Sequence, residues 1–237
     1  DFVNPAANIY LQHSHGTIVL STMAGLMPNI LVGTAPHANY WLIRTEDTNS
    51  EQLVEEYNWA AGAEFADSIG ADIINSSLGY TTFDVASQNH TYSQLDGKTT
   101  PATRAANIAA KKGMVVVISA GNDGDSPWRY ISAPADAKGV LTIGATTSTG
   151  ALASFSSVGP SADGRVKPDV SAMGYYTAVQ NTDGSIGAAN GTSLSAPVIS
   201  GMVACLWQAH REYTAMEIID LIKANASLSQ SPNNNLG

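Results

Sequence analysis

Stretches with the hydrophobic pattern of a β-strand alternate along this chain with stretches that have the spacing of an α-helix. Strands are expected at residues 39–45, 71–76, 114–119 and 140–145. The third of these, Met-Val-Val-Val-Ile-Ser, is almost entirely apolar, as in a strand that is buried on both faces. Because helical stretches separate the strands, the pattern predicts an α/β fold of three layers, with a mostly parallel sheet covered by helices on both faces.

Helices are predicted at residues 51–68, 101–112 and 192–208, and from Thr214 to Ala224. The first two are followed by Gly70 and Gly113, residues that readily end a helix. The third is apolar on nearly all sides and should be buried. The fourth begins with a Thr-x-x-Glu capping box. Residues 79–100 are polar without periodicity and are expected to form a long loop.

Composition narrows the class of protein. Of the 237 residues, 44% are hydrophobic and 13% are charged, so the chain can bury a sizeable core. No repeat or linker divides it, and we expect one domain spanning residues 1–237. The formal charge of −9 argues against nucleic acid as a partner. No apolar run reaches the length of a membrane span. The single cysteine excludes an internal disulfide and any multi-cysteine metal site.

Three short segments carry residues suited to acyl transfer. His15 precedes a glycine at the start of an apolar run and could act as a base. Asn122 follows the most buried strand, where its amide could donate to an anionic oxygen. Ser193 stands at the entry to the buried helix, where the free N–H groups of the first turn create a positive field. Each segment alone is more typical of a turn or a helix cap, but together they indicate a nucleophile, a base and an oxyanion donor.

The same segments resemble the signatures of the subtilisin-like serine peptidases, the subtilases. The resemblance rests on His15-Gly-Thr, Ser119-Ala-Gly-Asn and Gly191-Thr-Ser-Leu-Ser-Ala-Pro, in this order along the chain. Four further segments agree with it: Gly33-Thr-Ala-Pro36, Asn75-Ser-Ser-Leu-Gly79, Ala153-Ser-Phe-Ser-Ser-Val-Gly-Pro160 and Lys167-Pro-Asp-Val170. The resemblance extends from about His15 to Ala226 and implies a subtilisin-like fold.

The resemblance implies a serine endopeptidase that hydrolyses peptide bonds through an acyl-enzyme. Ser193 would be the nucleophile and His15 the general base, while Asn122 and the Ser193 N–H would hold the oxyanion. The polypeptide substrate would pair as an added strand with the backbone of Ser77, Leu78 and Gly79. One wall of the pocket for the residue before the scissile bond would consist of Ser119, Ala120 and Gly121.

The chain departs from the family pattern at the triad aspartate. Only Asp1 precedes His15, and Phe-Val follows it instead of the family's Asp-x-Gly turn. We therefore expect that the catalytic domain is truncated at the N-terminus, with the strand that carries the aspartate lying upstream, and that it is truncated at the C-terminus as well. This fragment would then be a poor protease, because nothing would orient His15 or stabilise its imidazolium.

Other expectations follow from the family. It implies secretion, or a periplasmic or cell-surface location, and a propeptide or inhibitor as a possible partner. No cofactor is expected. Calcium is common in subtilases, but the segment 26–32 offers only Asn29 as a side-chain oxygen donor. A zinc site at His13 and His15 lacks a third ligand with recognisable spacing.

Three functions other than a subtilisin-like peptidase are alternatives for this sequence. A module that binds peptides without cleaving them would explain the absent aspartate, but not the presence of His15, Asn122 and Ser193. An α/β-hydrolase esterase needs Gly-x-Ser-x-Gly, whereas this chain has Gly191-Thr-Ser-Leu-Ser195. The acid peptidases related to subtilases replace the histidine by glutamate and the asparagine by aspartate, and neither replacement is present.

Overall fold

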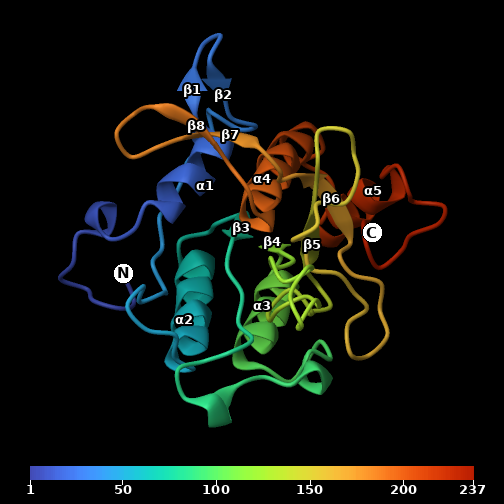
Figure 1. The fold of residues 1–237 in the computed structure, drawn as a ribbon. Helices are drawn as coiled ribbons and strands as arrows, with labels where there is room; N and C mark the ends of the chain where they lie inside the picture. Colours follow the sequence, from blue (N-terminus) through green and yellow to red (C-terminus); the bar gives the residue numbers. More distant parts are fainter.

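A four-stranded parallel sheet lies at the centre of the computed structural model, which describes all residues from 1 to 237 (Figure 1). The strands stand in the order β3-β4-β5-β6. Their bounds are β3 (Ile73–Ser76), β4 (Val115–Ser119), β5 (Leu141–Thr146) and β6 (Val170–Met173). In the register, Ile74 lies beside Val116 and Val117 beside Leu141. All five residues of β4 are buried, because strands flank it on both sides and helices cover both of its faces.

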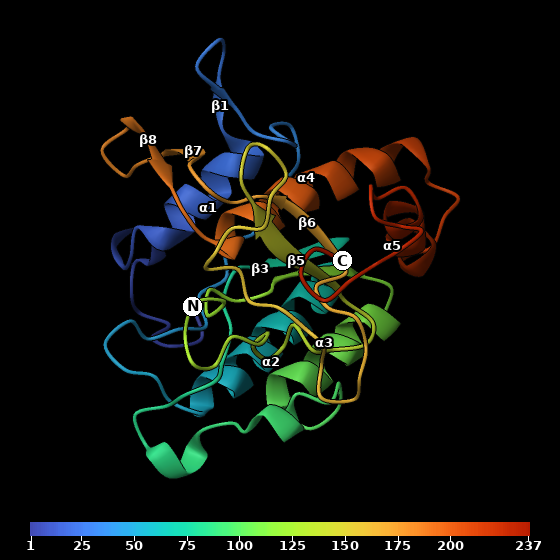
Figure 2. The same cartoon turned by 45° about the vertical axis from the view of Figure 1, so that its right-hand side comes forward.

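Helices cover the two faces of this sheet (Figure 2). On one face lie α2 (Val54–Ser68) and α3 (Pro101–Lys111), and on the other lie α4 (Thr192–Ala209) and α5 (Ala215–Ala224). Alternate residues of β4 contribute to the two cores: Val116 packs with the α2 and α3 side, and Val117 with the α4 and α5 side. The predicted three-layer α/β architecture is therefore confirmed.

The remaining elements lie around this core. Helix α1 (His15–Ala24) packs against α4. Two short antiparallel hairpins were not predicted: β1 (Leu26–Met27) with β2 (Leu31–Val32), and β7 (Thr177–Gln180) with β8 (Ile186–Ala189). Three single turns of 3₁₀-helix complete the structure: η1 (Ile9–Leu11), η2 (Ala86–Gln88) and η3 (Tyr92–Gln94). None of the helices is both long enough and apolar enough to cross a membrane.

The local signals predicted most element ends. Gly70 and Gly113 follow α2 and α3 with φ angles of 72° and 101°, a conformation that glycine adopts without strain. The capping box is present at the start of α5, where the N–H of Thr214 donates to a carboxylate oxygen of Glu217 at 2.7 Å. Helix α2 begins at Val54, three residues later than the predicted position 51.

The prediction of a strand at residues 39–45 is wrong. This segment is outside every helix and strand of the structure. It packs against α2 instead, since the side chains of Ile43 and Thr45 lie 3.1 Å from the position that a Cβ would take at Gly62. A strand needs a hydrogen-bonding neighbour, and the only backbone hydrogen bond from this segment to a distant residue runs from the N–H of Phe2 to the carbonyl of Arg44.

Helix α4 is less completely buried than its apolar sequence predicts. Its first half is enclosed, but Met202 is 38% exposed and Cys205 is also exposed. In this second half one side of the helix is exposed, while Val203 is buried and Leu206 and Trp207 pack against the same core.

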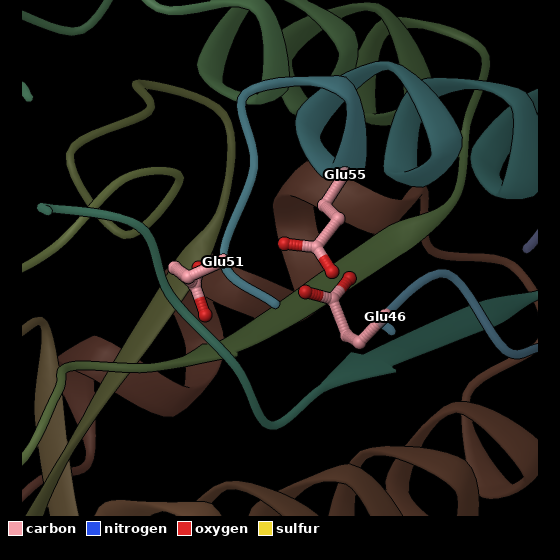
Figure 3. Close-up of side chains that lie close together, drawn as sticks. All are labelled: Glu46, Glu51 and Glu55. Atoms are coloured by element: carbon pink, nitrogen blue, oxygen red, sulfur yellow. The ribbon is translucent and has the colours of Figure 1, made fainter. Parts of the chain in front are cut away.

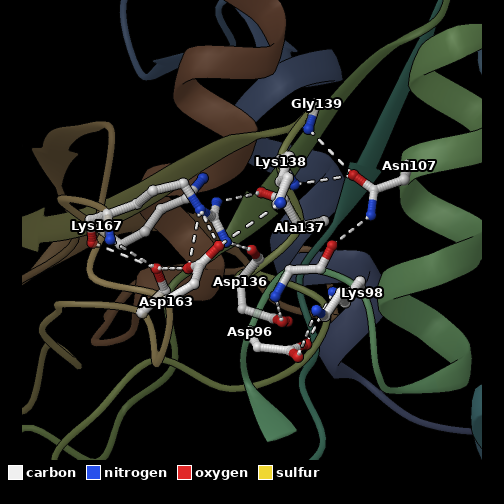
Figure 4. A network of polar contacts seen from close by, with 12 residues as sticks. Asp96, Lys98, Asn107, Asp136, Ala137, Lys138, Gly139, Asp163 and Lys167 are labelled. Atoms are coloured by element: carbon white, nitrogen blue, oxygen red, sulfur yellow. Dashed lines mark hydrogen bonds and ion pairs between the residues drawn. The ribbon is translucent and has the colours of Figure 1, made fainter. Parts of the chain in front are cut away.

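A network of polar contacts fixes the chain between β4 and β5 against α3 (Figure 4). The side chain of Asn107 accepts hydrogen bonds from the N–H groups of Lys138 and Gly139 and donates to the carbonyl of Gly97. The buried carboxylate of Asp136 accepts from the N–H of Gly97 at 2.8 Å. Because Asp136 follows Ile131–Ala133 closely along the chain, this network also restrains that segment.

Candidate active site

Ser193 lies in the first turn of α4, directly after the N-cap residue Gly191 and Thr192. Gly191 has a φ of 153°, a backbone conformation that residues other than glycine rarely adopt. The Ser193 hydroxyl donates to the carbonyl of Ser77 at 3.3 Å, and the Ser77 hydroxyl donates to the carbonyl of Ser193 at 2.9 Å. This reciprocal pair joins the start of α4 to the end of β3.

Asn122 is fixed at the N-terminus of α4 by Thr192. Its Oδ1 accepts from the N–H of Thr192 at 2.9 Å and from the Thr192 hydroxyl at 3.0 Å. Thr192 is fully buried, and its hydroxyl also accepts from the N–H of Gly121 at 3.2 Å. A carbon placed on Gly191 would lie 3.6 Å from both the Asn122 Nδ2 and the Ser193 nitrogen. The Asn122 amide and the Ser193 nitrogen therefore both lie near Gly191, at the start of α4.

His15 is the first residue of α1, a helix that contacts α4. Helix α1 packs along α4, where Val19 contacts Leu194 in a small core. The N–H of His15 donates to Nδ1 of His13 at 3.0 Å. The imidazole of His15 makes no hydrogen bond, and in particular none with Ser193. Burial, and secondarily the neighbouring His13, lower the pKa of His15, which favours the neutral form that a base requires.

The segment predicted to receive the substrate backbone follows β3. Leu78 is partly exposed and Gly79 is exposed, and neither their N–H groups nor their carbonyls make a hydrogen bond. Backbone groups of this kind can pair with an added strand. On the opposite wall, the N–H of Ala120 donates to Ile143 and its carbonyl accepts from Ser132, so Ala120 is held within the sheet and fully buried.

A cavity of about 240 Å³ opens beside Ser193. It brings together residues from the end of β3, the end of β4 and the start of α4. Its lining consists of Leu78, Gly79, Thr81, Ser119, Gly121, Asn122, Asp123, Ser132, Thr192 and Ser193. Thr81, Asp123 and Ser132 were not singled out from the sequence. The position of Asp123 directly after Asn122 was a usable signal, whereas Ser132 comes from a loop whose path the sequence does not specify.

No carboxylate hydrogen-bonds to His15. The carboxylate of Asp1 accepts from the N–H groups of Val3 and Asn4 and pairs with Arg44 at 3.3 Å. Asp1 therefore stabilises its own turn and its contact with the segment at residues 39–45, and it takes no part in the arrangement around Ser193.

Three glutamates lie together away from Ser193, at the start of α2 (Figure 3). Carboxylate oxygens of Glu46, Glu51 and Glu55 lie within 4.8 Å of one another. Protein donors hold two of them: Glu55 accepts from two backbone N–H groups, and Glu46 accepts from the hydroxyls of Thr45 and Tyr80. Burial and the neighbouring carboxylates raise the pKa of Glu51 to about 7. Burial likewise raises the pKa of Glu46.

Comparison with known proteins agrees with this geometry. The family model described as "Subtilase family" matches residues 1–237. The chain belongs to the subtilase family. Subtilases are serine endopeptidases, and subtilisin from Bacillus pumilus is 32% identical to this chain over 232 residues, which cover 95% of this chain and 75% of that protein.

Other subtilases match a smaller part of their own length. Subtilisin NAT from Bacillus subtilis subsp. natto is 32% identical over 95% of this chain, but the match covers 54% of that protein. The chain thus spans about half the length of this curated relative. Among solved structures, MycP1 with its N-terminal propeptide removed superposes with a TM-score of 0.78 at 26% identity, covering 100% of this chain and 80% of that one. A cold-adapted subtilisin-like serine proteinase gives 0.75 at 23% identity, covering 100% and 78%, and shows the shared fold.

Proposed function

We propose that this chain supplies the nucleophile, the base and the oxyanion site of a serine endopeptidase. Ser193 attacks the carbonyl carbon of the substrate while His15 takes the hydroxyl proton, and the acyl-enzyme forms as the leaving amine receives that proton. Asn122 Nδ2 and the Ser193 N–H hold the oxyanion in the meantime. The observation that carries the proposal is that Asn122 is hydrogen-bonded to Thr192 beside Ser193, and that all three line one cavity.

The substrate backbone binds along Ser77, Leu78 and Gly79. The free N–H and carbonyl groups of Leu78 and Gly79 support this role. Opposite them, Ser119, Ala120 and Gly121 provide the second wall, with Ser119 and Gly121 facing the cavity and Ala120 supporting them from the sheet. A peptide held in this way presents its scissile bond to Ser193.

The triad carboxylate comes from chain outside residues 1–237. Three observations support this proposal: the ring of His15 has no hydrogen-bond partner, Asp1 is engaged by Arg44, and β3 pairs only with β4. A further strand beside β3 would also give residues 39–45 a neighbour. The free edge of a sheet strand is readily paired by another segment of chain. The full-length protein, whose catalytic domain extends beyond these residues, then acts on polypeptides, and its family points to action outside the cytoplasm.

The proposal is tested by labelling the full-length protein with a fluorophosphonate probe. Ser193→Ala abolishes labelling, because the probe reacts with an activated serine, and His15→Ala lowers the labelling rate by orders of magnitude. Ser195→Ala is the matched control, since this buried serine lies two residues further along α4 and its hydroxyl has no partner. Labelling that survives Ser193→Ala would refute the assigned nucleophile.

The 237-residue chain by itself should cleave peptides far more slowly than the full-length protein, because His15 lacks its carboxylate partner. Equal rates would contradict an external carboxylate. A peptide-binding protein without catalysis is the second candidate, and the unpartnered ring of His15 favours it. It predicts that the full-length protein binds peptides but is never labelled at Ser193.

A further inference from the structure

The cavity beside Ser193 is lined by polar groups, although the resemblance to subtilases left its preference open. Leu78 is the only hydrophobic residue among the ten that line it. The inference that follows rests on the proposed function, because it concerns the substrate side chain that such a cavity would receive. That side chain belongs to the residue before the scissile bond, since the cavity lies between the substrate-pairing segment and the oxyanion donors.

The segment Ile131–Ala133 closes the cavity between its two walls. The N–H of Ser132 donates to the carbonyl of Ala120 at 3.1 Å, while Ala133 and Tyr80 exchange backbone hydrogen bonds of 3.2 and 2.8 Å. The Ser132 hydroxyl therefore lies between Gly79 and Gly121. A Cβ on Gly79 would collide with that oxygen, and one on Gly121 would lie 3.2 Å from it.

Three hydroxyl groups of the lining have no hydrogen-bond partner in the protein. They belong to Ser132, which is 4% exposed, to Ser119, which is 2% exposed, and to Thr81, which is partly exposed. These oxygens are open to solvent in the cavity, since none of them is among the buried side-chain atoms that lack a partner. An apolar side chain entering the cavity would displace solvent and leave these oxygens unpaired, whereas a side chain that carries N–H donors would pair with them.

Asp123 adds a negative charge to the same cavity. Its carboxylate receives one weak hydrogen bond, from the hydroxyl of Ser126 at 3.3 Å, and no lysine, arginine or histidine lies within ion-pair distance. An acidic side chain would be repelled at this position and a cation would be attracted.

We propose that this cavity selects a basic residue, lysine or arginine, immediately before the scissile bond. Asp123 supplies the counter-charge, and the hydroxyls of Ser119, Ser132 and Thr81 accept the remaining N–H donors, of which lysine has three and arginine five. The carboxylate of Asp123 and the three hydroxyl groups thus bind the same substrate side chain.

The test uses the full-length protein and quenched peptides that differ only in the residue before the scissile bond: lysine, arginine, glutamine, leucine, phenylalanine or glutamate. We expect kcat/KM for the lysine or arginine peptide to exceed that for the leucine peptide by about tenfold or more, and the glutamate peptide to be cleaved most slowly. Higher kcat/KM for leucine or phenylalanine than for the basic peptides would overturn the proposal.

Variants at Asp123 separate the charge from the shape of the cavity. Asp123→Asn should lower the ratio of kcat/KM for lysine over glutamine by about tenfold. Asp125→Asn is the matched control, because Asp125 is an exposed acid on the same loop that does not line the cavity. An unchanged ratio in Asp123→Asn, or an equal change in Asp125→Asn, would refute the role of Asp123.

Fluorophosphonate labelling distinguishes the two levels of failure. If Ser193 is labelled but basic peptides are not preferred, only the inference about the cavity is wrong. If Ser193 is not labelled in the full-length protein, the proposed function fails and the inference falls with it.

Discussion

The candidate active site has a nucleophile half and a base half, and the protein holds their side chains with different numbers of hydrogen bonds. On the nucleophile half, Ser193, Thr192 and Asn122 are joined by hydrogen bonds to one another or to the ends of β3 and β4. On the base half, His15 has a ring without any hydrogen-bond partner. The core of this chain therefore fixes the nucleophile half, whereas no hydrogen bond holds the ring of His15.

The difference has a physical origin in the sheet. The nucleophile half rests on β4, a strand with neighbours on both sides, and on the buried first half of α4. The base half stands on α1, whose main contacts are with α4, β7 and β2 and not with the strands of the central sheet. A site built on fully paired strands keeps its geometry, because each backbone group is already held by a neighbour.

The largest effect in the comparison is expected from Thr192→Val on the nucleophile half. The change keeps the shape of the side chain but removes the hydroxyl that binds Gly121 and Asn122. We expect kcat to fall about tenfold because the Asn122 amide keeps only its hydrogen bond from the Thr192 N–H and is held less firmly. The free energy of unfolding should fall by about 1–2 kcal/mol, since buried partners are left unpaired. Steady-state kinetics and urea unfolding measure the two effects.

Thr142→Val is the control for this prediction. Thr142 is also fully buried, its hydroxyl binds the carbonyl of Ala135 and the ammonium of Lys167, and it does not line the cavity. It should lose stability without loss of kcat. If both variants lost kcat equally, the effect of Thr192 would be general destabilisation and the nucleophile half would not be specially fixed.

A smaller effect, on the pH dependence of the free energy of unfolding, is expected from Glu51→Gln. Glu51 lies on the side of the molecule that carries residues 1–3. The native pKa of Glu51 is about 7, above its ordinary value of 4.5, so the folded state binds more protons than the unfolded state between these values. Stability must therefore fall as pH rises from about 4.5 to about 7. The contribution of Glu51 is about 1 kcal/mol, since solvent screens its half-exposed carboxylate.

Urea unfolding between pH 4 and pH 8 measures this slope in the wild type and in Glu51→Gln. The variant should show a shallower slope, not a flat one, because the pKa of Glu46 is raised as well. Glu64→Gln, at an exposed position on α2, should keep the wild-type slope. A wild-type slope in Glu51→Gln would show that burial and the neighbouring carboxylates do not raise the pKa of Glu51 in the folded protein.

The smallest effect concerns His13→Ala on the base half. Burial is the main cause of the lowered pKa of His15, and the neighbouring His13 is the second cause. Removing His13 should raise the pKa of His15, so the acid limb of the pH profile of kcat/KM should move to higher pH. His210→Ala, at the far end of α4, should leave the profile in place. A shift to lower pH in His13→Ala would mean that His13 stabilises the imidazolium.

Most of the fold was predictable from local patterns. Hydrophobic spacing predicted the strand at 114–119, and the conformational freedom of glycine predicted that two helices end near Gly70 and Gly113. Both signals act within a few residues. The strand expected at 39–45 failed because pairing depends on a neighbour, and no local pattern reports whether that neighbour is present. The short hairpins were missed for the same reason.

The sequence by itself determined the residues that could act in acyl transfer, His15, Asn122 and Ser193, because each stands in a motif of a few consecutive positions. The tertiary structure alone decided how they are held and what surrounds them. It placed Thr192 against Asn122, and Ser132 between Gly79 and Gly121. These contacts join residues from distant parts of the chain, where only the packing of the whole domain brings the polar groups together.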